Sequence, residues 1–264
     1  MPESSDSHTR IAQRNQSLVG VISVVAGCAA WWLVAHLAAL PAFILPSPGD
    51  VWRRFLSALA DGSLALHTAA TLSEILLGLG VGVGLATIIG YAVAKSRALE
   101  RMLSPYLVAT QAIPLVAIAP LLVIWFGPGM FSKILICAMI VFFPVLVNTI
   151  VGVRAVPLAL HDLMHSLHAR REQILLKLEI PAALPVFLGG LRIGATLSVI
   201  GAVVGELVGA DRGLGFLINV GRGQYDTALV FVAVFVLIAL ALALYGLVAL
   251  LESRALLWQE WRKE

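Results

Sequence analysis

The sequence contains little charge. Only 12% of its 264 residues are Asp, Glu, Lys or Arg, whereas 60% are hydrophobic. Soluble globular chains are about one quarter charged and roughly half apolar. A water-soluble fold of this length could not hide so much apolar surface while presenting so few charged side chains. The composition therefore excludes a typical cytosolic enzyme, a disordered chain and a secreted disulfide scaffold.

Cysteine is scarce, and the common catalytic motifs are missing. Cys28 and Cys137 each lie within an apolar stretch, and nothing in the sequence indicates a disulfide. None of the four lysines completes a G-x-x-x-x-G-K-[ST] phosphate loop, and neither H-E-x-x-H nor G-x-S-x-G occurs. We therefore expect a chain that is not an enzyme, that binds no cofactor and that does not hydrolyse ATP through such a loop.

Long apolar stretches predict a membrane protein. A helix of about 20 apolar residues crosses the hydrocarbon core of a bilayer, and its backbone polar groups must be satisfied internally there. Strands of a membrane barrel would instead alternate apolar and polar residues. We predict an all-α integral membrane protein with six transmembrane helices. They cover Leu18–Leu40, Ile75–Ala94, Tyr106–Phe126, Ile134–Val153, Val186–Val208 and Thr227–Leu251.

The lysines and arginines predict the orientation. Six spans put both termini on one side, which would hold 13 of the 18 basic residues, and the other side would hold 5. Basic residues concentrate on the cytoplasmic side of membrane proteins. We therefore expect a cytoplasmic tail at 1–17, a membrane domain at 18–251 and a cytoplasmic tail at 252–264. The net charge of +3 follows from this topology, so no nucleic-acid partner is expected.

Few polar side chains fall inside the predicted spans. Gln111 lies in the third span, Asn148 in the fourth, and Glu206 near the outer end of the fifth. Polar and ionisable residues within a membrane mark functional sites by default. These three are candidate pathway-lining residues, although Glu206 could equally reach the outer water. Glu74, near the outer start of the second span, is expected to be an interfacial carboxylate that faces water.

Glycines recur at a spacing of four residues in the second and fifth spans. Small residues at this spacing let helix backbones approach closely in lipid. The pattern predicts tight helix packing, either static or able to slide between two states. The residues are Gly78, Gly82 and Gly90 with Ala86 between them, a neighbouring stripe of Gly80 and Gly84, and Gly190, Gly194, Gly201, Gly205 and Gly209.

Two connections on the predicted outer side suggest short helices. Asp50–Leu59 is amphipathic, and Ser47 or Asp50 is placed to cap it. The glycine-rich segment Gly209–Asp226 contains an apolar run beginning at Phe216, which would dip back as a short re-entrant or interfacial helix.

The longest predicted cytoplasmic connection is the 154–185 loop. Two short amphipathic helices are expected in it, at about 158–169 and 171–180, with Pro157 in the first turn of one and Pro181 ending the other. An apolar face on such a helix fits the groove of a partner protein or the lipid headgroups, and both options stay open. In the first helix the face consists of Leu160, Leu163, Met164 and Leu167.

This loop resembles the signature of binding-protein-dependent ABC importer permeases, E-A-A-x-x-x-G-x(9)-I-x-L-P. Asp162-Leu163-Met164, His168 and Leu178-Glu179-Ile180-Pro181 keep its spacing, its acidic start and its proline, while the alanines and the glycine are replaced. Leu45-Pro-Ser-Pro48 and VVGELVGADRGLG at 203–215 look like the nitrate, sulfonate and taurine branch. That branch includes importers of thiamine precursors and riboflavin.

The resemblance implies a type I ABC importer permease fold with cytoplasmic coupling helices in the 154–185 loop. It implies two copies of the chain in the bacterial inner membrane, two separate ATP-binding subunits docked on the loop, and a periplasmic or lipid-anchored solute-binding protein. The solute would be a vitamin precursor, a sulfonate or a similar small organic molecule. The implied ATPase-coupling residues are Asp162, Leu163, Met164, Leu167, His168, Leu178 and Pro181.

Three alternatives are weighed against this interpretation. An ion-coupled secondary transporter would favour paired buried charges and inverted repeats, and neither is clear in the sequence. An intramembrane enzyme would need a nucleophile and a base in contact, but Cys28 and His36 are eight residues apart. A metal site on His161, His165 and His168 would lack further ligands, so solvated loop histidines are the default.

Overall fold

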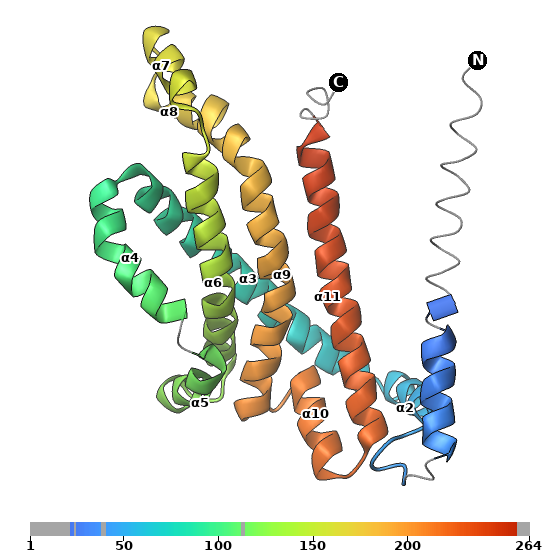
Figure 1. The fold of residues 1–264 in the computed structure, drawn as a ribbon. Coiled ribbons are helices and arrows are strands. Elements are labelled where there is room, and N and C mark those ends of the chain that lie inside the picture. The colour runs from blue at the N-terminus through green and yellow to red at the C-terminus, as the bar shows by residue number, and fades with distance from the viewer. Residues whose placement is uncertain (1–21, 24, 38–40, 112–113, 258–264) are drawn as a thin grey trace, which may run out of the picture.

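The computed structural model describes residues 22–257, except 24, 38–40 and 112–113, and all regular structure within these residues is helical (Figure 1). The predicted tail at 1–17 lies outside the described residues, as does most of the tail at 252–264. The elements are the helix Val25–Leu37, α2 (Pro48–Ala60), α3 (Ser63–Lys95), α4 (Arg97–Gln111), α5 (Leu115–Phe126), α6 (Met130–Arg154), α7 (Leu158–Ser166), α8 (Arg171–Ile174), the π-helix η1 (Leu175–Glu179), α9 (Ile180–Gly209), α10 (Leu214–Gly223) and α11 (Thr227–Ala255).

Four of the described helices are long and apolar enough to cross a membrane. They are α3, α6, the continuous segment Arg171–Gly209 and α11. The second, fourth, fifth and sixth predicted spans lie within them, so these predictions of helix are confirmed. Val25–Leu37 and α5 are apolar but shorter.

The third predicted span, Tyr106–Phe126, is wrong as a single helix. The structure places α4 and α5 there, with Pro114 as the N-cap of α5 in extended conformation (φ −69°, ψ 101°). Proline has no N–H to donate, and its ring disfavours helical geometry in the preceding residue. Figure 1 accordingly shows α4 and α5 as two separate helices that point in different directions.

The centre of the fold is α6, which packs closely against both α3 and α9. A β-carbon added to Gly82 of α3 would lie 2.8 Å from the carbonyl oxygen of Ala138, and one added to Gly201 of α9 would lie 2.7 Å from the Cα of Cys137. Such contacts leave no room for a side chain, so tight packing of these stripes is confirmed. A β-carbon added to Gly80, by contrast, would meet no atom of a neighbouring element within 4 Å.

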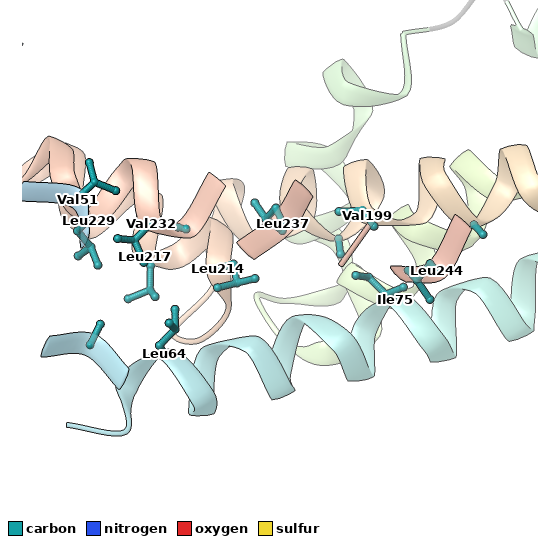
Figure 2. Close-up of a cluster of buried hydrophobic side chains, with 14 of the residues drawn as sticks. Val51, Leu64, Ile75, Val199, Leu214, Leu217, Leu229, Val232, Leu237 and Leu244 are labelled. Atoms are coloured by element: carbon teal, nitrogen blue, oxygen red, sulfur yellow. The ribbon is translucent and has the colours of Figure 1, made fainter. Parts of the chain in front are cut away.

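Besides the contacts around α6, a cluster of buried apolar side chains joins α2, α10 and α11 to α3 and α9 (Figure 2). The predicted short helix after Gly209 is confirmed as α10, and its Leu214 and Leu217 are buried in this cluster. The labelled side chains are Val51, Leu64, Ile75, Val199, Leu214, Leu217, Leu229, Val232, Leu237 and Leu244.

The amphipathic helix expected after Pro48 is confirmed as α2. Ser47 is its N-cap: the Ser47 hydroxyl accepts a hydrogen bond from the Asp50 amide at 3.2 Å, and the Asp50 carboxylate accepts from the Ser47 amide at 3.2 Å. Hydrogen bonding from the Ser47 hydroxyl holds the pKa of Asp50 below its ordinary value. Both predicted capping residues therefore act together, as a capping box.

Pro181 does not end a helix, which corrects the sequence prediction. It lies in the first turn of α9, and the chain stays helical for 39 residues, from Arg171 to Gly209. The preceding turn is η1, in which the Ile180 amide donates to the Leu175 carbonyl five residues back. A proline ring inside an α-helix collides with the carbonyl four residues earlier, and the wider π turn relieves this conflict.

Candidate functional site

The predicted coupling residues start on α7, which projects at one end of the molecule with α8 beside it (Figure 1). In the isolated chain, Leu163 is 53% exposed and Leu167 is 68% exposed. Asp162 and His168 are also exposed, and Met164 is half-buried. The helix thus presents apolar side chains that no other described segment covers.

His168 adopts a left-handed backbone conformation, with φ at 54°. The Ala169 amide donates to the Met164 carbonyl at 3.0 Å, and the His168 amide donates to the His165 carbonyl at 2.9 Å. This pair of bonds is a Schellman motif, which usually carries glycine at the left-handed position. His168 therefore occupies the position where the permease signature has glycine and keeps the backbone shape that glycine favours.

Leu178 and Pro181, the last two predicted coupling residues, lie outside α7, in η1 and the first turn of α9. Both are half-buried where η1 enters α9, next to the membrane helices. A cavity of about 450 Å³ opens beside this junction. It is lined by Thr87, Ile88 and Tyr91 of α3, Thr149 and Val153 of α6, and Leu175, Glu179, Ile180, Ala183, Leu184 and Phe187.

The structure places two of the three candidate pathway residues, Asn148 and Glu206. Asn148 of α6 is half-buried against Gly190 of α9, and its amide donates to the Pro144 carbonyl at 2.8 Å. Gln111 is the last residue of α4, and its side chain lies outside the part of the chain that the structure describes. Glu206 lies on α9 beneath α10. Asn148 and Glu206 therefore lie at different levels of α9, and the pathway role of all three residues stays a prediction.

Glu74 does not face water, contrary to the sequence prediction. It is 2% exposed, and its carboxylate forms an ion pair with the ammonium of Lys133, which is 5% exposed. Charged groups taken out of water need a partner of opposite charge, and α6 supplies one to α3. Lys133 is one of the 5 basic residues expected on the outer side, and its pairing with Glu74 was not expected from the sequence.

Glu206 is completely buried, and its carboxylate holds the turn before α10. Thr71 donates its hydroxyl to one oxygen at 2.6 Å, and the Gly215 amide donates to the other at 2.5 Å. The Leu214 amide in turn donates to the Thr71 hydroxyl at 2.8 Å. This carboxylate connects α10 to α3 and α9, and its role in the pathway stays a prediction.

His67 and Thr71 of α3 lie beside Glu206 and contact the same turn. The Gly213 amide donates to Nδ1 of His67 at 3.0 Å, beside the Thr71 contacts. His67, Thr71 and Glu74 follow one another at spacings of four and three, which places them on one face of a helix. This spacing was a signal available from the sequence.

The three loop histidines do not form a metal site. In the described part of the chain, no group of three or more His, Cys, Asp or Glu side chains is arranged to hold a metal ion.

Comparison with known families and proteins identifies the family of this chain. Residues 78–256, more than half of the chain, match the family described as binding-protein-dependent transport system inner membrane component. The riboflavin transport system permease protein RibX of Chloroflexus aurantiacus is 48% identical over 229 residues, covering 87% of this chain and 85% of RibX.

Two further relatives match over a similar length. The formylaminopyrimidine transport permease protein ThiX of Halalkalibacterium halodurans is 34% identical, covering 87% of this chain and 91% of ThiX. The taurine transport system permease protein TauC of Escherichia coli is 35% identical, covering 88% of this chain and 86% of TauC.

The fold resembles solved structures of the MetNI methionine ABC transporter in inward-facing conformations. One chain of that transporter aligns with a TM-score of 0.62 at 19% identity, covering 70% of this chain and 93% of its own length. At this identity the likeness concerns the fold. The family match and the relatives show more: the chain is a multi-pass, non-catalytic subunit without a cofactor, and the ATPase is a separate subunit. This chain therefore belongs to the binding-protein-dependent transport system inner membrane components, the permease subunits of ABC transporters.

Proposed function

We propose that this chain forms the translocation pathway of an ATP-driven importer for a small organic solute, as a pair of identical copies in the bacterial inner membrane. The observation that carries the proposal is the exposed apolar face of α7. This face lies in the loop that has the spacing of the permease signature. The same loop leads through α8 and η1 into the long membrane helix α9. Such a face suits a groove on an ATP-binding subunit.

The proposed topology has six crossings with both termini in the cytoplasm. Four long helices supply four crossings, and the helix Val25–Leu37 and the predicted span Tyr106–Phe126, shared by α4 and α5, supply the others. Figure 1 shows α7 and the end of α11 at one end of the molecule, with α2 and α10 toward the other. This arrangement supports a cytoplasmic end that carries the 154–185 loop and an outer end closed by α2 and α10.

The proposed partners follow from these two ends. Two ATP-binding subunits would dock on the coupling segment, and a periplasmic or lipid-anchored solute-binding protein would deliver the solute at the outer end. A partner that binds two permease states unequally shifts the population between them. The coupling residues would be Asp162, Leu163, Met164, Leu167, His168, Leu178 and Pro181.

The proposed solute is a nitrogen heterocycle of the riboflavin or pyrimidine type. Two of the relatives reported above are named for riboflavin and formylaminopyrimidine transport, and the riboflavin permease shares more identity with this chain than the taurine permease does. A sulfonate such as taurine is the competing solute.

The decisive experiment is reconstitution of the complete transporter. The chain, purified with the partners that accompany it from its native membrane, is placed in proteoliposomes with ATP inside, and uptake of labelled riboflavin, formylaminopyrimidine and taurine is measured. We expect ATP-dependent uptake of one heterocycle and no ATPase activity from the chain alone. ATP hydrolysis by the isolated chain would contradict the proposal.

A matched pair of variants tests the docking face. Leu163→Asp should prevent copurification of the ATP-binding subunit while membrane insertion stays intact. Leu257 lies outside the 154–185 loop and is similarly exposed, 58% against 53% for Leu163. Leu257→Asp should therefore leave copurification unchanged. Normal copurification and uptake with Leu163→Asp would remove the docking role.

An ion-coupled secondary transporter, the alternative weighed from the sequence, does not fit the family to which the chain belongs. The buried charges of Lys133, Glu74 and Glu206 resemble the paired intramembrane charges of such transporters. Uptake driven by a proton or sodium gradient in liposomes without ATP would contradict the proposed ATP-driven import.

A further inference from the structure

Glu179 is a buried carboxylate at the last position of η1, between the 154–185 loop and the membrane helices. It is 2% exposed. One oxygen accepts a hydrogen bond from the Tyr91 hydroxyl at 2.9 Å, and the other forms an ion pair with the ammonium of Lys95. Tyr91 and Lys95 are one helical turn apart at the end of α3. The carboxylate thus ties the π turn to the end of α3.

The same carboxylate also faces α7. Nε2 of His161 lies 3.9 Å from the Glu179 oxygen that pairs with Lys95. His161 immediately precedes Asp162, the first residue of the predicted coupling signature. Three elements, α3, α7 and the η1–α9 helix, therefore meet at one buried side chain.

The surroundings of Glu179 leave space for movement. Glu179 borders the cavity of about 450 Å³ described above and a groove of about 360 Å³ lined by residues including His161, His165 and Arg171. Glu179 and Tyr91 line both spaces. A π turn is less regular than an α-helical turn and often marks a functional position, so η1 is a place where the loop can bend against α9.

We propose that Glu179 is a positioning residue that transmits movement of α7 to α3. A shift of α7 displaces His161 and the η1 turn, and the bonds from Glu179 to Lys95 and Tyr91 then draw the end of α3 with them. This inference rests on the proposed function as an ATP-driven permease. It assigns a role to a residue that occupies an unspecified position, the x of I-x-L-P, in the signature.

The test uses the complete transporter in proteoliposomes and measures solute imported per ATP hydrolysed. Glu179→Gln keeps the size of the side chain but removes the charge that Lys95 binds. Energetic coupling between two sites typically changes affinity by a factor of about 5 to 150. We therefore expect the ratio of imported solute to hydrolysed ATP to decrease by a factor of about 5 to 150, while ATP hydrolysis continues. A purely structural defect would lower both activities together and leave the ratio unchanged.

Two further variants make the assignment specific. Exchanging the charges in the double variant Lys95→Glu with Glu179→Lys restores an ion pair at this place and should recover most of the lost ratio. Glu100→Gln is the control. It breaks the nearby ion pair between Glu100 and Arg154, which involves no residue of α7, and should leave the solute-to-ATP ratio unchanged.

The outcomes separate this inference from the proposed function. If the wild-type transporter shows no ATP-driven uptake, the proposed function fails. If the wild type transports and Glu179→Gln keeps the wild-type ratio, the positioning role is wrong and the permease function stands. Should Glu179→Gln fail to assemble, Tyr91→Phe and Lys95→Gln each remove one contact on α3, and a wild-type ratio in both would overturn the inference.

Discussion

Lys133 of α6 forms an ion pair with Glu74 of α3, and both side chains are buried where the two helices pack together. A second carboxylate, Glu206 of α9, lies in the same buried region. Carboxyl groups from two different helices therefore lie near the ammonium of Lys133. This relationship links three of the long membrane helices at one level of the bundle.

Removing the ammonium should destabilise the protein strongly. Lys133→Met leaves buried carboxylates without a cationic partner, and breaking a buried pair in this way costs about 3–5 kcal/mol. The measurement is thermal unfolding of the purified chain in detergent. Lys177→Met, which changes an exposed lysine, is the control. Equal unfolding temperatures for the two variants would show that the pair contributes little.

The glycine contacts predict opposite effects for two neighbouring substitutions on α3. Gly82→Ala would force a β-carbon against the Ala138 backbone of α6, and overpacking of this kind costs about 1–3 kcal/mol. Gly80→Ala meets open space and should be neutral or stabilise by about 0.5–1 kcal/mol, because alanine favours the helix. Chemical unfolding of both variants in the same detergent compares them. Similar losses in both would contradict the close α3–α6 packing.

Replacing His168 by glycine should stabilise the end of α7. The left-handed conformation costs a residue with a side chain about 1–2 kcal/mol, and glycine avoids that cost. His165→Gly, within α7, should instead lose about 1 kcal/mol of helix stability. Hydrogen exchange of the α7 amides reports both changes. Faster exchange in His168→Gly would argue against the Schellman geometry.

The Glu100–Arg154 pair predicts an acid-dependent loss of stability. Arg154 donates to both carboxylate oxygens, at 2.5 and 2.8 Å, and this hydrogen bonding lowers the pKa of Glu100 below its ordinary value of 4.5. Because the folded-state pKa is depressed, the contribution is present above pH 4.5 and disappears as the pH falls through the lower folded value. Unfolding temperatures measured across this range should fall less in Glu100→Gln than in the wild type. An identical acid dependence in both proteins would exclude a contribution from the pair.

Glu206 can be tested as an anchor and as a pathway residue together. Glu206→Gln and Thr71→Val each weaken the contacts that hold the turn before α10, so both should lower the unfolding temperature and loosen α10. If Glu206 lines the pathway, Glu206→Gln should change the solute concentration dependence of uptake, which Thr71→Val should not. Wild-type uptake kinetics in both variants would confine Glu206 to the anchoring role.

The sequence determined the features that depend on short stretches of chain. Low charge and long apolar runs predicted a helical membrane protein, and the Ser47–Asp50 pattern predicted a capped helix, since a cap involves residues only three positions apart. The glycine spacing predicted the packing faces of α3 and α9 for the same reason. The spacing in the 154–185 loop indicated the family, even with His168 where glycine is usual.

Only the tertiary structure decided which distant groups meet. Glu74 resembled an interfacial carboxylate until α6 brought Lys133 to it, and Glu206 acquired its partners when α10 folded back against α3. Pro181 resembled a helix end, but the preceding π turn let the helix continue. The physical reason is common to all three: helix periodicity and hydropathy are local properties, whereas burial, charge pairing and backbone relief depend on neighbours that the folded chain supplies.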